Sequence, residues 1–148
     1  MKTGYWRLKT AYRRLETGYW RLITMRITNL ILAVMFIIFA FVQVNDPDPL
    51  VWILIYGLMA VTCVMAAFDY YLPKVLMAMA IILGGYAIFY FPGLREWLQH
   101  DDKIKLFDNL AKMEFSYIEE SREFLGLIIC VAVLIMHIYR SFRQKSLG

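Results

Sequence analysis

Residues 27–44 read ITNLILAVMFIIFAFVQV and contain no charged side chain. Residues 50–68 (LVWILIYGLMAVTCVMAAF) and 75–91 (VLMAMAIILGGYAIFYF) have the same character, and residues 124–139 (FLGLIICVAVLIMHIY) form a slightly shorter fourth stretch. As helices rising 1.5 Å per residue, the first three would each reach about 26 to 28 Å, close to the hydrocarbon thickness of about 30 Å. The sequence therefore predicts four membrane-spanning helices.

The composition favours insertion into a membrane over a soluble fold. Hydrophobic residues make up 61% of the 148 residues, and the mean hydropathy is +0.55, whereas soluble domains are close to half apolar. A buried core helix is the alternative for any one stretch, but four stretches in so short a chain leave too few polar residues to cover them. We expect an all-α integral membrane four-helix bundle, in the plasma membrane or in the inner membrane of a bacterium.

Polar segments separate the apolar stretches. Residues 45–49 (NDPDP) end the first stretch, and residues 69–74 (DYYLPK) separate the second from the third. Proline suits both places, because it ends one helix and fits the first turn of the next. Residues 92–122 form the one long polar connection. The spacing of its apolar residues predicts one or two amphipathic helices at the membrane surface, with disorder as the alternative.

Residues 1–24 contain a seven-residue repeat that reads TGYWRLK, TAYRRLE and TGYWRLI. Because the repeat includes positions that would face solvent, we interpret it as a duplication in the DNA and expect the native chain to start at Met25. The alternative is a basic, aromatic helix on an anionic membrane surface. The segment lacks the plan of a secretory signal and should be helical in either case. We expect a single membrane domain over residues 25–148.

The basic excess lies almost entirely in the repeat. Residues 1–24 hold six basic residues and one acidic residue, whereas residues 25–148 hold ten basic and eleven acidic. The main body has no basic excess, so no nucleic-acid partner is predicted. Cytoplasmic termini place 11 Lys and Arg on the cytoplasmic side against 5 on the other, or 5 against 5 if the chain starts at Met25. The positive-inside rule thus favours cytoplasmic N and C termini.

Individual residues within the stretches predict how the helices pack. Ala80 and Gly84 lie four residues apart, which favours a close helix contact. Gln43 and Tyr56 are expected to face the bundle interior. Trp52 lies near a predicted helix end, where an amphipathic ring suits the membrane interface.

The cysteines and histidines carry no recognisable site motif. Cys63 and Cys130 lie inside apolar stretches without CxxC spacing, so we expect small buried hydrophobic residues and not a disulfide. His100 and His137 have no spaced ligand partners and are expected at the surface or the membrane interface. The sequence has no Gly-rich phosphate loop, nucleophile elbow or HExxH motif, and no cofactor is predicted.

Two polar segments at the ends of the spans form the candidate site. Four spans place residues 45–49 and 119–123 (EESRE) at the same membrane face. Glu119 and Glu123 lie one helical turn apart, so they share one side of a helix. Ionisable groups so close to the hydrocarbon are costly, and their presence suggests a functional role. The charged residues expected to converge at this mouth of the bundle are Asp46, Asp48, Glu119, Arg122 and Glu123.

This cluster has two interpretations. Its carboxylates, Asp46, Asp48, Glu119 and Glu123, with the Asn45 amide, are ligands that suit a hard cation, and such a site needs at least three convergent oxygens. In the structural interpretation, which we favour, the acidic residues cap helix N-termini and an aspartate pairs with Arg122.

The two motifs also resemble a known family. Residues 41–57 (FVQVNDPDPLVWILIYG) and 119–129 (EESREFLGLII) are similar to the transmembrane protein 220 family, over residue 25 to about 139. The resemblance implies a small polytopic membrane protein and supplies no reaction. The motif positions it singles out are Gln43, Asn45, Asp46, Pro47, Asp48, Trp52, Tyr56, Glu120, Arg122, Glu123 and Gly126.

Three functions remain open at this point. We favour a binding or accessory membrane protein, with the lipid bilayer and a membrane protein or a second copy of the chain as partners. The second hypothesis is a membrane enzyme that acts on a lipid or small apolar substrate, with Asp46 or Glu123 as the base. The third is a transporter subunit, which is disfavoured because each span contains only about one polar residue deep in the membrane.

Overall fold

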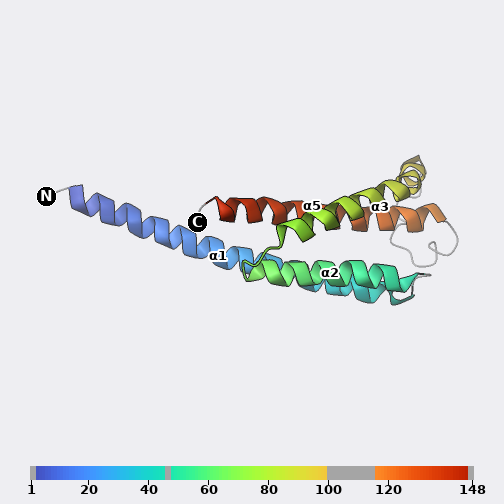
Figure 1. The fold of residues 1–148 in the computed structure, drawn as a ribbon, viewed down its shortest axis with the longest axis horizontal. Coiled ribbons are helices and arrows are strands. Elements are labelled where there is room, and N and C mark those ends of the chain that lie inside the picture. The colour runs from blue at the N-terminus through green and yellow to red at the C-terminus, as the bar shows by residue number, and fades with distance from the viewer. Residues whose placement is uncertain (1–2, 46–47, 100–115, 147–148) are drawn as a thin grey trace. The chain divides into compact units, whose positions relative to one another are not determined.

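The computed structural model describes residues 3–45, 48–99 and 116–146, and this part of the chain is all-helical (Figure 1). It contains no strand. The elements, in chain order, are α1 (Thr3–Val42), the short 3-10 helix η1 (Gln43–Asn45), α2 (Pro49–Ala67), α3 (Pro73–Gln99) and α5 (Ser116–Lys145). The predicted all-α fold class is confirmed.

Four helices in the described residues are long and apolar enough to cross a membrane. The candidate spans are Gly18–Val42, Pro49–Ala67, Pro73–Gln99 and Ser116–Gln144. Each candidate span includes most or all of one of the four apolar stretches found in the sequence. The described residues thus contain as many candidate spans as the sequence predicts, and the chain is an integral membrane protein with several spans.

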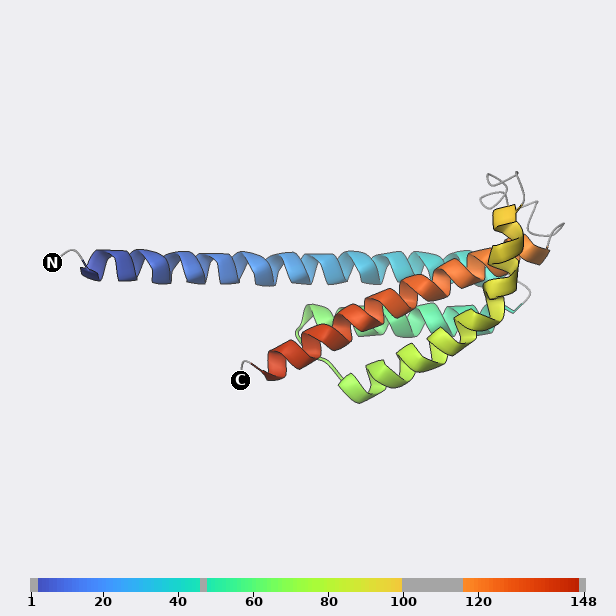
Figure 2. The ribbon, with the colours of Figure 1, turned by 90° about the horizontal axis from the view of Figure 1, so that it is seen from above.

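The helices form two compact units, Met1–Tyr70 and Tyr71–Gly148. In the first unit α1 contacts α2, and in the second α3 contacts α5. The two helices of each unit run antiparallel, as Figure 2 shows. Each unit is thus a helical hairpin with its own packing.

The first unit ends in a defined helix cap. After α2, Asp69 adopts φ 59°, the left-handed region that aspartate tolerates better than most residues. Its N–H donates to the carbonyl of Ala66 at 3.2 Å, and the N–H of Tyr70 donates to the carbonyl of Met65 at 3.0 Å. This pair of bonds is a Schellman motif, which satisfies carbonyls that the end of a helix leaves free. The predicted break after residue 68 therefore has a specific local cause.

The helix α3 continues beyond the residue at which the sequence predicts its end. It passes through Pro92 to Gln99, and Figure 2 shows a bend in this last part. Proline has no N–H to donate to the carbonyl of Ile88, and its ring crowds the preceding turn, so a bend and not a termination results. Residues 92–99 are thus helical, as the amphipathic interpretation of the connection predicts.

The helix α5 begins at Ser116, eight residues before the predicted span at 124. The polar segment 119–123 therefore belongs to the first turns of the helix and not to a loop before it. The predicted helical character of the connection is confirmed for 92–99 and 116–122, whereas 100–115, including His100, lie outside the described residues.

Candidate polar site

The first motif is only partly described. Gln43 lies in η1 and is half-buried, and Asn45 ends the same element, although its side chain lies outside the described part. Asp46 and Pro47 also lie outside it. Asp48 occupies the N-cap position of α2 but makes no side-chain capping hydrogen bond and is exposed. Proline at the start of the helix reduces the need for a cap, since its missing N–H is one of the unsatisfied donors.

The two aromatic residues of this motif lie in the core of the first unit. Tyr56 is 4% exposed, and its ring lies 6.0 Å from that of Trp52 and 5.5 Å from that of Phe39 between centroids. Phe36 stacks on Tyr56 at 6.2 Å with an interplanar angle of 22°. Tyr56 faces the interior as predicted. Trp52 does not lie at an exposed interface, because it is fully buried, and its ring contact with Tyr56 directs it inward.

The second motif occupies the first turns of α5 and is partly buried. Ser121 is fully buried and Glu123 is 8% exposed, whereas Glu119, Glu120 and Arg122 are half-buried. The Ser121 hydroxyl donates to the carbonyl of Tyr117 at 2.7 Å, within the same helix. Charged groups therefore stand at the edge of the apolar part of α5, and one of them is nearly withdrawn from solvent.

The two helices of the second unit approach each other closely at Gly93. A Cβ atom added to Gly93 would collide with the Cβ and the carboxylate of Glu120. Only a glycine can occupy this position without displacing α5, because the obstruction includes the Cβ atom of Glu120 and not merely the end of its side chain. Gly93 thus positions the second motif against α3.

Residue spacing predicts a close contact at Gly84 and gives no such signal at Gly93. A Cβ added at Gly84 would meet nothing within 4 Å, so the close contact predicted at Ala80 and Gly84 does not occur within this unit. The third apolar stretch was placed at residues 75–91, so Gly93 fell in the polar connection and not in the span. Because α3 continues through Pro92, Gly93 is a helical residue that faces α5.

Two nitrogen donors near this contact lack a partner. Trp97 packs against Ile118, which is fully buried, together with Tyr117. The Trp97 Nε1 and the Arg122 Nη1 are both inaccessible to solvent and have no hydrogen-bond partner among the described residues. A buried donor without an acceptor costs about 1–3 kcal/mol, and more if it is charged. Within the described residues, this end of the α3–α5 hairpin therefore contains two buried N–H donors without an acceptor.

No three His, Cys, Asp or Glu side chains of the described residues are placed to hold a metal ion. Asp48, Glu119 and Glu123 were three of the four weak candidates, and the fourth, Asp46, lies outside the described part. Cys63 and Cys130 are both buried, as predicted. The described geometry gives no support to the hard-cation interpretation.

His137 is buried, and the expectation of a surface or interface position was wrong. Its side chain is 0% exposed, and its ring lies 6.1 Å from that of Tyr71, in an edge-on arrangement. Leu134 and Ser141 are also buried, and at three and four residues from His137 they share one face of α5. The inner face of this helix therefore continues to its C-terminal end.

These observations define a class of protein: a helical membrane protein with several spans, whose polar residues gather at the helix ends. The family model described as "Transmembrane family 220, helix" matches residues 35–139. The chain belongs to this family, which confirms the resemblance carried by the two motifs. Comparison with the curated proteins and with the solved structures found no match.

Proposed function

We propose that this chain is a binding or accessory protein of the membrane, with a polar site at one membrane face formed around the start of α5. The observation that carries the proposal is the pair of solvent-inaccessible donors, Trp97 Nε1 and Arg122 Nη1, without an acceptor in the described residues. Because both atoms are N–H donors, the complementary ligand presents an acceptor, such as a carboxylate or phosphate oxygen.

The neighbouring carboxylates shape the same site. Glu120 lies against Gly93, where Ser116 donates from its hydroxyl to the Glu120 Oε1 at 3.3 Å. Glu123 is nearly buried one residue beyond Arg122. These acidic groups would repel a ligand of high negative charge and would favour a small monoanion or a neutral carbonyl group. We therefore propose a polar site that binds small ligands of low charge and not one that binds any anion.

The predicted membrane topology indicates which side of the membrane this site would face. If each candidate span crosses the bilayer, residues 45–49 and 119–123 face the same compartment, and both termini face the other. The basic residues at the C-terminal end of α5, Arg140, Arg143 and Lys145, favour cytoplasmic termini. The polar site then faces away from the cytoplasm, and residues 45–49 would border the same membrane face.

The indole N–H signal of Trp97 provides a direct test. The chain has four tryptophans, so a ¹⁵N-labelled sample of the full chain in detergent gives few indole signals, and Trp97→Phe assigns the relevant one. Titration with acetate should shift the Trp97 signal and leave that of Trp52 unchanged. Arg122→Gln should abolish the shift, because it removes the charge that attracts the acetate.

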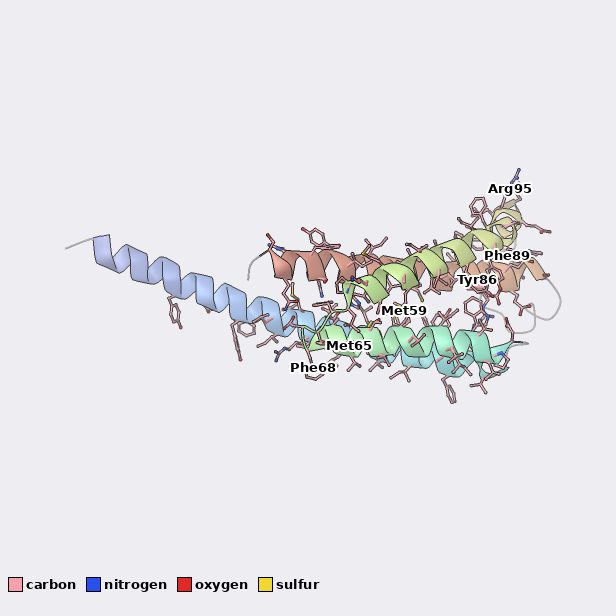
Figure 3. All side chains as sticks on the ribbon, viewed as in Figure 1. Met59, Met65, Phe68, Tyr86, Phe89 and Arg95 are labelled. Carbon is pink, nitrogen blue, oxygen red and sulfur yellow. The ribbon has the colours of Figure 1, made fainter. Side chains whose placement is uncertain are left out.

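The matched control is Arg95→Gln, which removes a positive charge near the same end of α3. Arg95 is exposed and projects outward (Figure 3), so its loss should leave the acetate response intact. A Trp97 signal that responds neither to acetate nor to inorganic phosphate would contradict the proposed site. So would a response that survives in Arg122→Gln.

A further inference from the structure

The opposite end of the α3–α5 hairpin is basic and contains no acidic residue in either segment. Residues 70–78 include Lys74, and residues 135–146 include Arg140, Arg143 and Lys145, while neither segment contains Asp or Glu. The nearest acidic residue before these segments is Asp69, whose backbone N–H caps α2 in the first unit. The charged side chains of these two segments are therefore all positive.

The structure brings these two segments together. Tyr71, just before α3, places its ring 6.1 Å from that of His137, one turn before Arg140 on α5. Figures 1 and 2 both show the start of α3 and the end of α5 at the same end of the hairpin. Lys74, in the first turn of α3, and Arg143 are exposed, whereas Arg140 is half-buried. Basic groups from both helices thus flank a shared, partly buried end.

Arg140 has an unsatisfied donor at this end. Its Nη1 is inaccessible to solvent and has no hydrogen-bond partner among residues 3–45, 48–99 and 116–146. A guanidinium carries five N–H donors and no acceptor, and its planar fork suits phosphate oxygens. A charged donor withdrawn from water at the end of a span requires an acceptor at the depth of the membrane surface.

We propose that Lys74, Arg140 and Arg143 bind the phosphate headgroup of an anionic phospholipid at this membrane face. Charge complementarity at the depth of the lipid headgroups favours this ligand. The candidate span of α5 ends at Gln144, so Arg140 and Arg143 lie where the hydrocarbon gives way to headgroups. Negatively charged lipids are concentrated in the cytoplasmic leaflet, on the side where cytoplasmic termini would place these residues.

Lipid selectivity in detergent tests the proposal. The full-length chain is titrated with phosphatidylglycerol or with phosphatidylcholine, and bound lipid is counted by native mass spectrometry. The wild type should bind phosphatidylglycerol in preference. Each Lys or Arg replaced by Gln should weaken that binding about fivefold, and the triple variant K74Q/R140Q/R143Q about a hundredfold.

Three single variants make the outcome decisive. Arg95→Gln removes one positive charge at the other end of α3 and should leave phosphatidylglycerol binding unchanged. Arg143→Gln alone alters an exposed side chain, so it preserves the fold even if the triple variant unfolds, and it should still show the fivefold loss. Arg140→Lys should retain most of the binding, because it keeps the charge.

Several results would overturn the proposal. Equal binding of phosphatidylcholine would show that the end has no preference for charge. Wild-type affinity in the Arg143→Gln and triple variants would remove these residues from the interaction. Competition by inorganic phosphate as strong as that by phosphatidylglycerol would assign the site to a free anion and not to a lipid. Competition by an acidic peptide alone would assign it to a protein partner.

Discussion

The two helical hairpins of this protein hold their helices together in different ways. In the α1–α2 hairpin, aromatic rings fill the interface around Tyr56, and a Cβ added at Gly57 would meet nothing within 4 Å. In the α3–α5 hairpin, the contact is a close approach at Gly93, against the polar residue Glu120. The α1–α2 interface depends on large aromatic side chains, whereas the α3–α5 interface depends on a glycine that has no side chain.

The difference shows that membrane insertion alone does not determine how the helices pack against each other. Lipid tails are as apolar as the helix surfaces, so burial of hydrocarbon gives little net drive to associate the helices. Association then depends on shape and on polar contacts. Interlocking rings and a glycine contact are two solutions to this problem, and substitutions that affect one hairpin and not the other distinguish them.

The largest effect is expected for Trp52→Ala in the aromatic hairpin. Removing this fully buried side chain leaves a cavity beside Tyr56. The cost in soluble cores is about 3–5 kcal/mol, and we expect about 3 kcal/mol because lipid replaces part of the lost apolar environment. The free energy of unfolding by sodium dodecyl sulfate, followed by helix content in detergent, measures it. A loss below about 1 kcal/mol would show that the rings do not hold this hairpin.

Gly93→Ala should destabilise the second hairpin by about 1–3 kcal/mol, because the new methyl group forces α5 away from α3. The same unfolding measurement applies. Gly85→Ala is the matched control in the same helix, since a Cβ there would meet nothing within 4 Å. Equal effects of the two substitutions would contradict the close contact at Gly93.

Tyr56→Phe separates ring packing from the hydroxyl group in the first hairpin. The substitution keeps the ring that contacts Phe36, Phe39 and Trp52 and removes only one hydrogen-bonding group. We expect a loss of about 0.5–1.5 kcal/mol, well below that of Trp52→Ala. If the loss matches or exceeds that of Trp52→Ala, the hydroxyl and not the stacked rings determines the stability of this unit.

The smallest effect, and of opposite sign, is expected for Gly57→Ala in α2. The added methyl group enters open space, and alanine is favoured over glycine in a helix interior by about 0.5–1 kcal/mol. We expect slightly increased stability in the same assay. A clear destabilisation would indicate that the first hairpin, like the second, depends on a close approach at glycine.

The sequence predicted the four spans without any structure, because hydropathy adds along the chain and does not depend on neighbours in space. Its two motifs, residues 41–57 and 119–129, predicted the family. It also predicted the burial of Tyr56, Cys63 and Cys130. It placed the end of the third span at residue 91, whereas α3 continues through Pro92 to Gln99, since a proline in a long apolar helix can bend the helix without ending it.

The sequence alone determined that this chain crosses a membrane several times and that its polar residues stand at the ends of its spans. Tertiary structure decided which residues meet: Gly93 against Glu120, His137 against Tyr71, and Trp52 within the aromatic cluster. The physical reason is that insertion depends on the composition of each helix taken singly. A contact between two helices depends on the shape and the hydrogen-bonding groups of both helix surfaces. The sequence of one helix does not specify which surface of another helix it will contact.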